Sequence, residues 1–236
     1  MIITGRNAIR EALRAGNVKS LSVLSRLEKD PVVKEARGLN VPVKLVDDNE
    51  LTRMAKNSSH QGFVAISKDL ETVTLEELIQ GAKNTTYPLL LMLDGIEDPQ
   101  NLGAIIRTAD ALGVNGVIIK KRGEAPLNAT VSKVSTGAVN WVKVAAVTNL
   151  TQAINTLKEK GYWIVASDGE AKQDYDQVDY KSPICLIVGS EGFGISKLVL
   201  KNSDFVVKIP MCGHVNSLNA SVSTAILAAE IQRSRK

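Results

Sequence analysis

Residues 209–223 read Ile-Pro-Met-Cys-Gly-His-Val-Asn-Ser-Leu-Asn-Ala-Ser-Val-Ser and decide how the second half of this chain folds. The residues just before them, 205–209, have the pattern of a strand, and Pro210 and Gly213 then mark a turn. The polar trio at 217–219 opens a helix. Backbone N–H groups converge where a strand turns into a helix, so α/β proteins bind ligands at such turns. The stretch therefore predicts an α/β domain with a ligand site at this turn.

Two earlier segments have the same order of strand, polar turn and helix. Residues 101–107 read Asn-Leu-Gly-Ala-Ile-Ile-Arg, and residues 186–194 read Leu-Ile-Val-Gly-Ser-Glu-Gly-Phe-Gly. Near-continuous apolar strands alternate with helices through residues 89–236, which indicates a parallel sheet covered on both faces. Three polar turns in one such domain suggest one shared site.

The chemistry of these turns excludes one common function and leaves two roles open for an arginine. A dinucleotide-binding fold places the motif G-x-G-x-x-G directly after the first strand, but the turn at 94–103 does not contain this motif. The later glycines at 189–194 are also compatible with a simple tight bend. Arg107 has apolar neighbours and needs an anionic partner, since such a charge is costly alone. That partner is either a carboxylate of this chain, such as Glu191, or a phosphate or ribose ligand.

Composition places the chain among globular proteins and gives no sign of a membrane or metal protein. It has 236 residues, of which 44% are hydrophobic and 23% charged, a balance typical of folded domains. No apolar run has the length of a membrane span, and the first residues lack the apolar core of a signal peptide. Cys185 and Cys212 do not have the spacing of a metal site, even with His214 nearby. We expect a cytoplasmic protein without a bound metal.

The positive charge is concentrated in the first part of the chain. Residues 1–68 carry 12 Lys/Arg and 7 Asp/Glu, an excess that attracts phosphate backbones, although an ordinary basic surface would look the same. Short helices and strands alternate there, with Thr4 expected to cap the first helix, and predict a small α/β domain. Residues 69–87 are acidic at first and are expected to be a linker, with residues 88–236 as the second domain.

Together, the segments Asn101-x-Gly-x-Ile-x-Arg107, 186–194 and 209–221 resemble the three signature motifs of the SpoU, or TrmH-like, family. This family belongs to the SPOUT superfamily of RNA methyltransferases. The front part of the chain looks like the substrate-binding domain of the members that act on ribosomal RNA, and residues 60–62, His-Gln-Gly, fit that pattern. The resemblance covers nearly the whole chain.

The resemblance implies an α/β SPOUT domain whose parallel sheet carries a deep trefoil knot that forms an S-adenosylmethionine pocket. It also implies a homodimer that methylates a ribose 2′-hydroxyl, with guanosine in large-subunit (23S) ribosomal RNA as the expected target. Three residues would line the methyl-donor pocket: Gly189, Ile209 and Leu218. Arg107 would meet the RNA phosphate and ribose. Four polar residues would position Arg107, the ribose and the loops: Asn101, Glu191, Ser217 and Asn219.

Alternatives remain at this point. A transfer RNA 2′-O-methyltransferase would use the same chemistry, and a non-catalytic RNA-binding or ribosome-assembly factor would keep the fold. Trp141 either stacks on a base or is a partly buried core residue. An apolar stripe on the last helix serves either the core or an interface: Leu218, Val222, Ile226 and Ala229.

Overall fold

The computed structural model describes residues 1–56 and 59–236, which group into two units. The front unit comprises Met1–Glu71 and Leu127–Trp141, and the rear unit comprises Thr72–Pro126 and Val142–Lys236. The grouping differs from the expected boundaries, because 127–141 leaves the second domain and joins the first. Helix α6 (Ala129–Val134) of this segment packs on strand β1 (Ile2–Thr4). A Cβ atom at Gly137 would lie 2.5 Å from Cβ of Glu11, so the segment fits closely against helix α1 (Arg6–Arg14).

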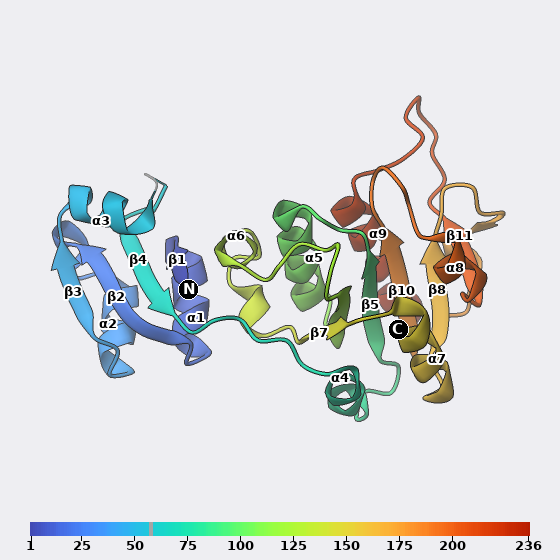
Figure 1. Ribbon diagram of the computed structural model, residues 1–236, viewed down its shortest axis with the longest axis horizontal. Helices are drawn as coiled ribbons and strands as arrows, with labels where there is room; N and C mark the ends of the chain where they lie inside the picture. Colours follow the sequence, from blue (N-terminus) through green and yellow to red (C-terminus); the bar gives the residue numbers. More distant parts are fainter. Residues whose placement is uncertain (57–58) are drawn as a thin grey trace. The chain divides into compact units, whose positions relative to one another are not determined.

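The front unit is built on a four-stranded mixed sheet in the order β1-β4-β2-β3 (Figure 1). Its strands after β1 are β2 (Val18–Leu24), β3 (Val43–Val46) and β4 (Phe63–Ser67). Strand β4 pairs antiparallel with β1 and β2, and β2 pairs parallel with β3. The remaining helices of this unit are α2 (Pro31–Gly38) and α3 (Asp48–Ala55).

The helices of the front unit follow the sequence pattern, with one correction. Helix α1 buries one apolar face at helical spacing, which consists of Ala8, Ile9, Ala12 and Leu13. Thr4 was expected to cap this helix, but it is the last residue of β1 and pairs with Val64. Gly5 occupies the cap position instead, at φ 91°, where the chain must turn sharply out of the strand. Asp30 and Asp47 cap α2 and α3 with their side chains.

The rear unit contains a seven-stranded parallel sheet, which confirms the expected fold class. The strand order is β7-β6-β5-β10-β8-β11-β9. The strands are β5 (Leu89–Asp94), β6 (Gly116–Lys120), β7 (Val144–Val147), β8 (Trp163–Ser167), β9 (Gln173–Asp174), β10 (Ile184–Gly189) and β11 (Phe205–Lys208). Strands β5 and β10 lie at the centre and are buried along almost their whole length, which explains their continuous apolar sequence.

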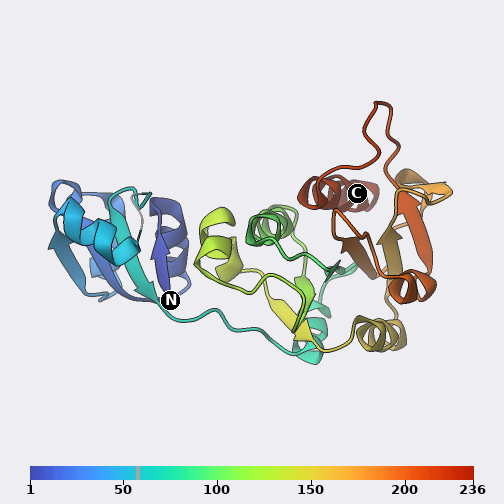
Figure 2. The same cartoon turned by 45° about the horizontal axis from the view of Figure 1, so that its top comes forward.

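Helices cover both faces of this sheet (Figure 2). Helices α5 (Pro99–Ala111) and α9 (Ala220–Ser234) pack on each other on one face. Helices α4 (Leu75–Ala82), α7 (Leu150–Glu159) and α8 (Lys197–Lys201) share a buried core on the other. Short 3-10 turns occur at Ser25–Leu27, Ala138–Asn140 and Tyr175–Gln177. Across residues 1–56 and 59–236, no helix combines the length and apolar character needed to cross a membrane.

The segment expected to be a linker is largely folded onto the rear sheet. Val73 forms a bridge to Ala145, and helix α4 follows with Leu78 fully buried. Thr74 and Glu77 close a capping box at the start of α4, with hydrogen bonds in both directions. Two of the acidic residues that suggested a linker, Glu76 and Glu77, therefore lie at a helix N-terminus, where negative charge is favourable.

Candidate active site

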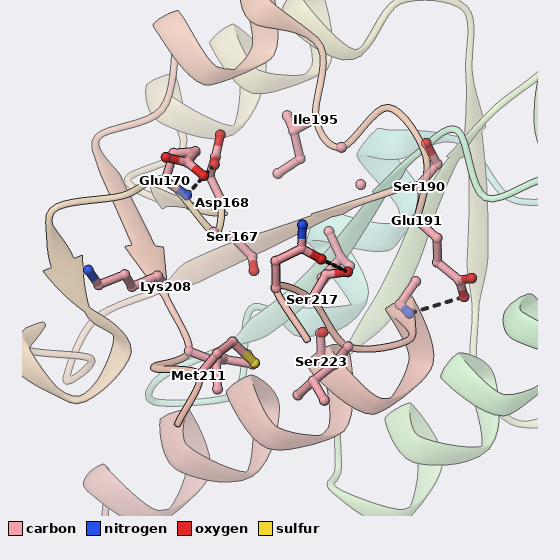
Figure 3. Close-up of a pocket in the computed structure, with 18 of the residues that line it drawn as sticks. Ser167, Asp168, Glu170, Ser190, Glu191, Ile195, Lys208, Met211, Ser217 and Ser223 are labelled. Atoms are coloured by element: carbon pink, nitrogen blue, oxygen red, sulfur yellow. Dashed lines mark hydrogen bonds between the residues drawn. The ribbon is translucent and has the colours of Figure 1, made fainter. Parts of the chain in front are cut away.

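A cavity of about 670 Å³ opens at the carboxyl ends of β8, β10 and β11 in the rear unit (Figure 3). Its walls are the three segments that follow these strands. They are residues 167–170 after β8, 189–195 after β10, and 208–218 between β11 and α9. The last segment projects beyond the sheet (Figure 1). Two of the three sequence motifs thus meet at this cavity, as parallel strands that end at one edge require.

The three residues assigned to donor binding all line this cavity: Gly189, Ile209 and Leu218. Gly189 ends β10, and the next residues fold back so that the Gly194 amide donates to the Ser190 carbonyl at 2.9 Å. A Cβ atom at Gly189 would lie 2.2 Å from the carbonyl carbon of Gly194. Glycine is therefore required here by the closure of the loop itself, which agrees with the tight bend that the glycines at 189–194 permit.

A cluster of hydrogen bonds joins the three motifs beside the cavity. The Asn101 side chain donates to Oε1 of Glu191 at 3.0 Å, and Asn219 donates to Oδ1 of Asn101 at 2.9 Å and also to Glu191. The Ala220 amide, at the start of α9, reaches the same carboxylate at 3.4 Å (Figure 3). Asn219 also caps α9, since its Oδ1 accepts from the Ser221 amide at 2.9 Å. Asn101, expected at a turn, lies in the first turn of α5.

Arg107 and Ser217 are the two remaining predicted residues, and neither belongs to this cluster. Ser217 lines the cavity, and its hydroxyl lies 3.5 Å from Oδ1 of Asn216. Arg107 is exposed on α5 and forms no ion pair or hydrogen bond with any residue that the structure describes. A structural pair with Glu191 is therefore not formed, and the guanidinium is free to bind an anion.

Three charged residues that contact the turns next to the cavity were not predicted from the sequence: Asp94, Lys120 and Glu124. Asp94 ends β5, and its carboxylate accepts from the Ser196 amide at 2.9 Å and from Nζ of Lys120 at 2.9 Å. Glu124 accepts from the amides of Gly95 and Ile96 at 2.7 Å each. The cluster thereby fixes the turn before α5 and the end of the 189–195 loop. Because its members come from separate strands and turns, no local sequence pattern could reveal it.

The protonation of these carboxylates follows from their surroundings. Burial raises the pKa of Asp94, but the hydrogen bonds from the Ser196 amide and the Lys120 ammonium outweigh it and leave the pKa below its usual value. For Glu124, burial prevails over the two backbone N–H groups and raises the pKa to about 7.

The cavity and its rim contain further residues that sequence reasoning missed. Asp168 and Glu170 follow β8 directly and line the cavity, as does Lys208 at the end of β11. A polar run directly after a buried strand was the available signal. Phe193 is 98% exposed at the rim. It was not predicted because it lies between glycines that are compatible with a simple tight bend. Among the described residues, no group of three or more His, Cys, Asp or Glu side chains is placed to hold a metal.

His60 and Trp141 of the front unit form hydrogen bonds with other residues of that unit. His60, from the His-Gln-Gly segment, is buried, and its Nδ1 accepts from the Gly62 amide at 3.1 Å while Nε2 lies 3.1 Å from the Thr52 hydroxyl. Trp141 is 49% exposed, and its indole N–H donates to Glu11 at 3.1 Å. It is thus a half-exposed residue anchored to α1 rather than a core aromatic.

Residues 88–229 match the SpoU rRNA Methylase family, and residues 2–73 match the RNA 2′-O ribose methyltransferase substrate-binding domain. The chain belongs to the SpoU family. Membership accounts for the meeting of the three motifs at one edge of the sheet. A protein of Staphylococcus haemolyticus assigned to the TrmH family of tRNA/rRNA methyltransferases is 40% identical, over 100% of this chain and 96% of its own length.

Solved structures agree with this assignment. An RNA 2′-O ribose methyltransferase superposes with a TM-score of 0.81 at 27% identity, covering 100% of this chain and 88% of its own. An AdoMet-bound rRNA methyltransferase from Sinorhizobium meliloti superposes with a TM-score of 0.83 at 26% identity, covering 98% and 86%. This SpoU protein is therefore an RNA 2′-O-ribose methyltransferase.

Proposed function

We propose that this enzyme transfers a methyl group from S-adenosylmethionine to a ribose 2′-hydroxyl of large-subunit ribosomal RNA, with guanosine as the target nucleoside. The observation that carries the proposal is the juxtaposition of the cavity with the Asn101–Glu191–Asn219 cluster. An activated methyl donor in the cavity and a ribose at the cluster would face each other across Glu191, which belongs to both.

The donor would be held by Gly189, Ile209 and Leu218 and the loops that contain them. When bound, it supplies a sulfonium methyl group that is already electrophilic, so alignment of the ribose can provide much of the rate enhancement. The protein's task is then to orient the ribose and to exclude water. The hydrogen-bonded cluster is suited to this task because it ties the start of α5, the loop after β10 and the start of α9 together.

Arg107 would bind the RNA phosphate and stabilise the negative charge that develops on the 2′-oxygen. A guanidinium keeps its proton at neutral pH, so it serves as an anion anchor and an electrostatic stabiliser rather than as a base. That role is supported by the absence of a carboxylate partner for Arg107 within residues 1–56 and 59–236. Glu191 is engaged by two asparagine side chains, which favours positioning over proton abstraction. Ser217 would contact the ribose or the donor from the cavity wall.

Ribosomal RNA is favoured over transfer RNA by the front unit, because it matches the substrate-binding domain over residues 2–73. The structural neighbour from Sinorhizobium meliloti is also an rRNA methyltransferase. The relative from Staphylococcus haemolyticus is assigned to both RNA classes, so transfer RNA remains the second candidate.

We also propose that the enzyme is a cytoplasmic homodimer with a trefoil knot in the rear unit. Helix α9 buries a different face from the expected stripe, namely Thr224, Leu227, Ala228 and Ile231. Val222, one member of the stripe, is 45% exposed, and Val215 in the preceding loop is 64% exposed. An exposed apolar surface beside the site supports a second subunit there. A molar mass of one chain by light scattering at micromolar concentration would contradict the dimer.

The substrate is tested by offering unmodified 23S ribosomal RNA and bulk transfer RNA to the enzyme with labelled S-adenosylmethionine, and then mapping the product. We expect label in one ribosomal 2′-O-methylguanosine. Label confined to transfer RNA would replace the substrate and keep the reaction. No transfer to either RNA, although the donor binds, would support an RNA-binding protein without catalysis.

A further inference from the structure

The charges on the wall of the cavity are strongly unbalanced. The titratable side chains that line it are four carboxylates, Asp168, Glu170, Asp174 and Glu191, and a single ammonium, Lys208. Their formal sum is three negative charges. Lys208 forms no ion pair with any residue described in the structure, so it does not neutralise a particular carboxylate. The cavity therefore presents a net negative potential to whatever it holds.

The carboxylates lie at both ends of the cavity. In Figure 3, Asp168 and Glu170 stand at one end, and Glu191 stands at the other. Asp168 is held in place by backbone contacts, because its Oδ1 accepts from the Glu170 amide at 2.8 Å and its own amide donates to the Val207 carbonyl at 2.9 Å. A bound molecule would thus lie between fixed negative charges rather than beside one mobile side chain.

The methyl donor and its product differ in net charge, and a negatively charged cavity binds molecules of different net charge with different affinity. S-adenosylmethionine carries a sulfonium, an ammonium and a carboxylate, so it is a net cation. When the methyl group leaves, the electron pair of the S–CH₃ bond remains on sulfur, the 2′-oxygen takes the methyl group, and the hydroxyl proton is released. The product S-adenosylhomocysteine is then neutral overall, because the sulfonium charge has gone.

We propose that the carboxylates led by Asp168 and Glu170 make this cavity selective for the cationic donor over the neutral product, so that methyl transfer itself loosens the spent cofactor. The proposal rests on the assignment of the cavity to S-adenosylmethionine. Lys208 has a different part: it would meet the amino-acid carboxylate that donor and product share, and so contribute to both affinities. The summed negative charge of the wall acts on the net charge of the bound molecule, which is the property that differs between donor and product.

The test is isothermal titration of the full-length protein with S-adenosylmethionine, S-adenosylhomocysteine and sinefungin, which keeps a positive charge near the position of the sulfonium. At low salt we expect the donor and sinefungin to bind about 3- to 10-fold more tightly than the product, and the gap to narrow as salt screens the field. Product affinity that equals or exceeds donor affinity in the wild type would overturn the proposal.

Matched variants locate the effect. Asp168→Asn keeps an oxygen to accept from the Glu170 amide and removes the charge, and Glu170→Gln removes the neighbouring one. We expect each to lower the donor-to-product preference by about 2- to 5-fold, with the product affinity little changed. Asp179→Asn is the control, since Asp179 makes the same kind of turn contact, with the Lys181 amide at 3.0 Å, outside the cavity.

The outcomes separate this inference from the proposed function. An unchanged preference in both Asp168→Asn and Glu170→Gln, with thermal stability retained, would contradict the role of the acidic wall while leaving the donor site in place. Failure of the wild type to bind any of the three molecules would instead contradict the assignment of the cavity. A Lys208→Met variant should weaken donor and product binding together without reducing the preference.

Discussion

Arg107 and Arg235 lie in the same unit of the protein, and their surroundings are opposite. Arg235 follows helix α9 and donates hydrogen bonds from its guanidinium to the carbonyl oxygens of Tyr87, Tyr180 and Ser182, each at 2.9 Å. Burial lowers its pKa to about 10. Arg107 is exposed and has no partner among the described residues. The guanidinium of Arg235 is bonded within the fold, whereas that of Arg107 forms no bond with a described residue.

The front unit extends this contrast. Arg6 pairs with Asp30 at 3.1 Å, and Arg10 and Arg14 both pair with Glu35, at 3.0 and 2.9 Å. The arginines of α1 therefore contribute to the net charge but are engaged within the fold. A count of charges along the sequence thus overstates how many are free to bind phosphate, and the partners of each arginine are the better guide.

The largest effect is expected from Arg107→Ala. Loss of an electrostatic stabiliser at a reacting oxygen typically lowers kcat by about 10²- to 10³-fold. Donor affinity and thermal stability should stay near wild type, because Arg107 does not line the cavity and forms no hydrogen bond or ion pair with a residue that the structure describes. Methyl-transfer kinetics, donor titration and thermal melting on the same sample measure all three. Arg233→Ala removes an exposed arginine paired with Glu230 and should leave kcat unchanged.

Arg235→Ala should give the reverse result. Three partly buried carbonyl groups would lose their donors, which we expect to lower the free energy of unfolding by about 2–4 kcal/mol. The methyl-transfer rate per folded molecule should change little. Urea unfolding of Arg235→Ala and Arg233→Ala measures the difference. For Arg233→Ala we expect the free energy of unfolding to fall by less than about 1 kcal/mol. Equal losses in the two variants would show that the carbonyl contacts of Arg235 contribute little.

Glu191 combines a place in the site with bonds inside the fold. It lines the cavity and also accepts hydrogen bonds from Asn101 and Asn219. Glu191→Ala should lower kcat by about 10- to 100-fold through loss of alignment. Glu191→Gln keeps one oxygen acceptor and should recover part of that rate. If Gln and Ala were equally inactive and both lost the rise in rate on the acid side of the pH–rate profile, Glu191 would be a base rather than a positioning residue.

The smallest effect concerns Glu124, which lies beside the paired cation Lys120. Its folded-state pKa of about 7 lies above the value of an unfolded glutamate, so the folded protein holds its proton more tightly. Its contribution to stability is present at low pH and is lost as the pH rises through about 7. Unfolding free energies at pH 5 and pH 8 should therefore differ less in Glu124→Gln than in wild type, by on the order of 1–2 kcal/mol. An identical pH dependence in the two proteins would contradict the raised pKa.

Much of the rear unit could be predicted from the sequence because its buried strands are apolar without interruption and its helices repeat apolar residues at helical spacing. Strand β1 was missed because it is only three residues long. The sequence allows a short helix at Leu75–Ala82, where α4 lies, but the acidic residues around its start favour a linker over a helix with a buried Leu78. The place of 127–141 in the front unit depends on packing that no local pattern encodes.

The site, like the fold, has residues that could be predicted from the sequence and residues that could not. Motif residues that line the cavity or join its polar cluster were found because their loops follow strands that end at one edge of the sheet. Asp94, Lys120 and Glu124 were not found, because each reads as an ordinary surface charge until the strands bring them together. Arg107 was expected to have a partner in the chain or in the substrate, and only the structure could eliminate the first option.

We propose that the donor occupies the cavity and that Arg107 binds the substrate rather than a carboxylate of its own chain. Crystals of the protein grown with S-adenosylmethionine test this most directly. We predict donor density against Gly189, Ile209 and Leu218, with the sulfonium methyl group directed toward the Asn101–Glu191–Asn219 cluster and Arg107 still without a carboxylate partner. Donor density elsewhere in the protein, or Arg107 paired with a carboxylate of its own chain, would contradict the account.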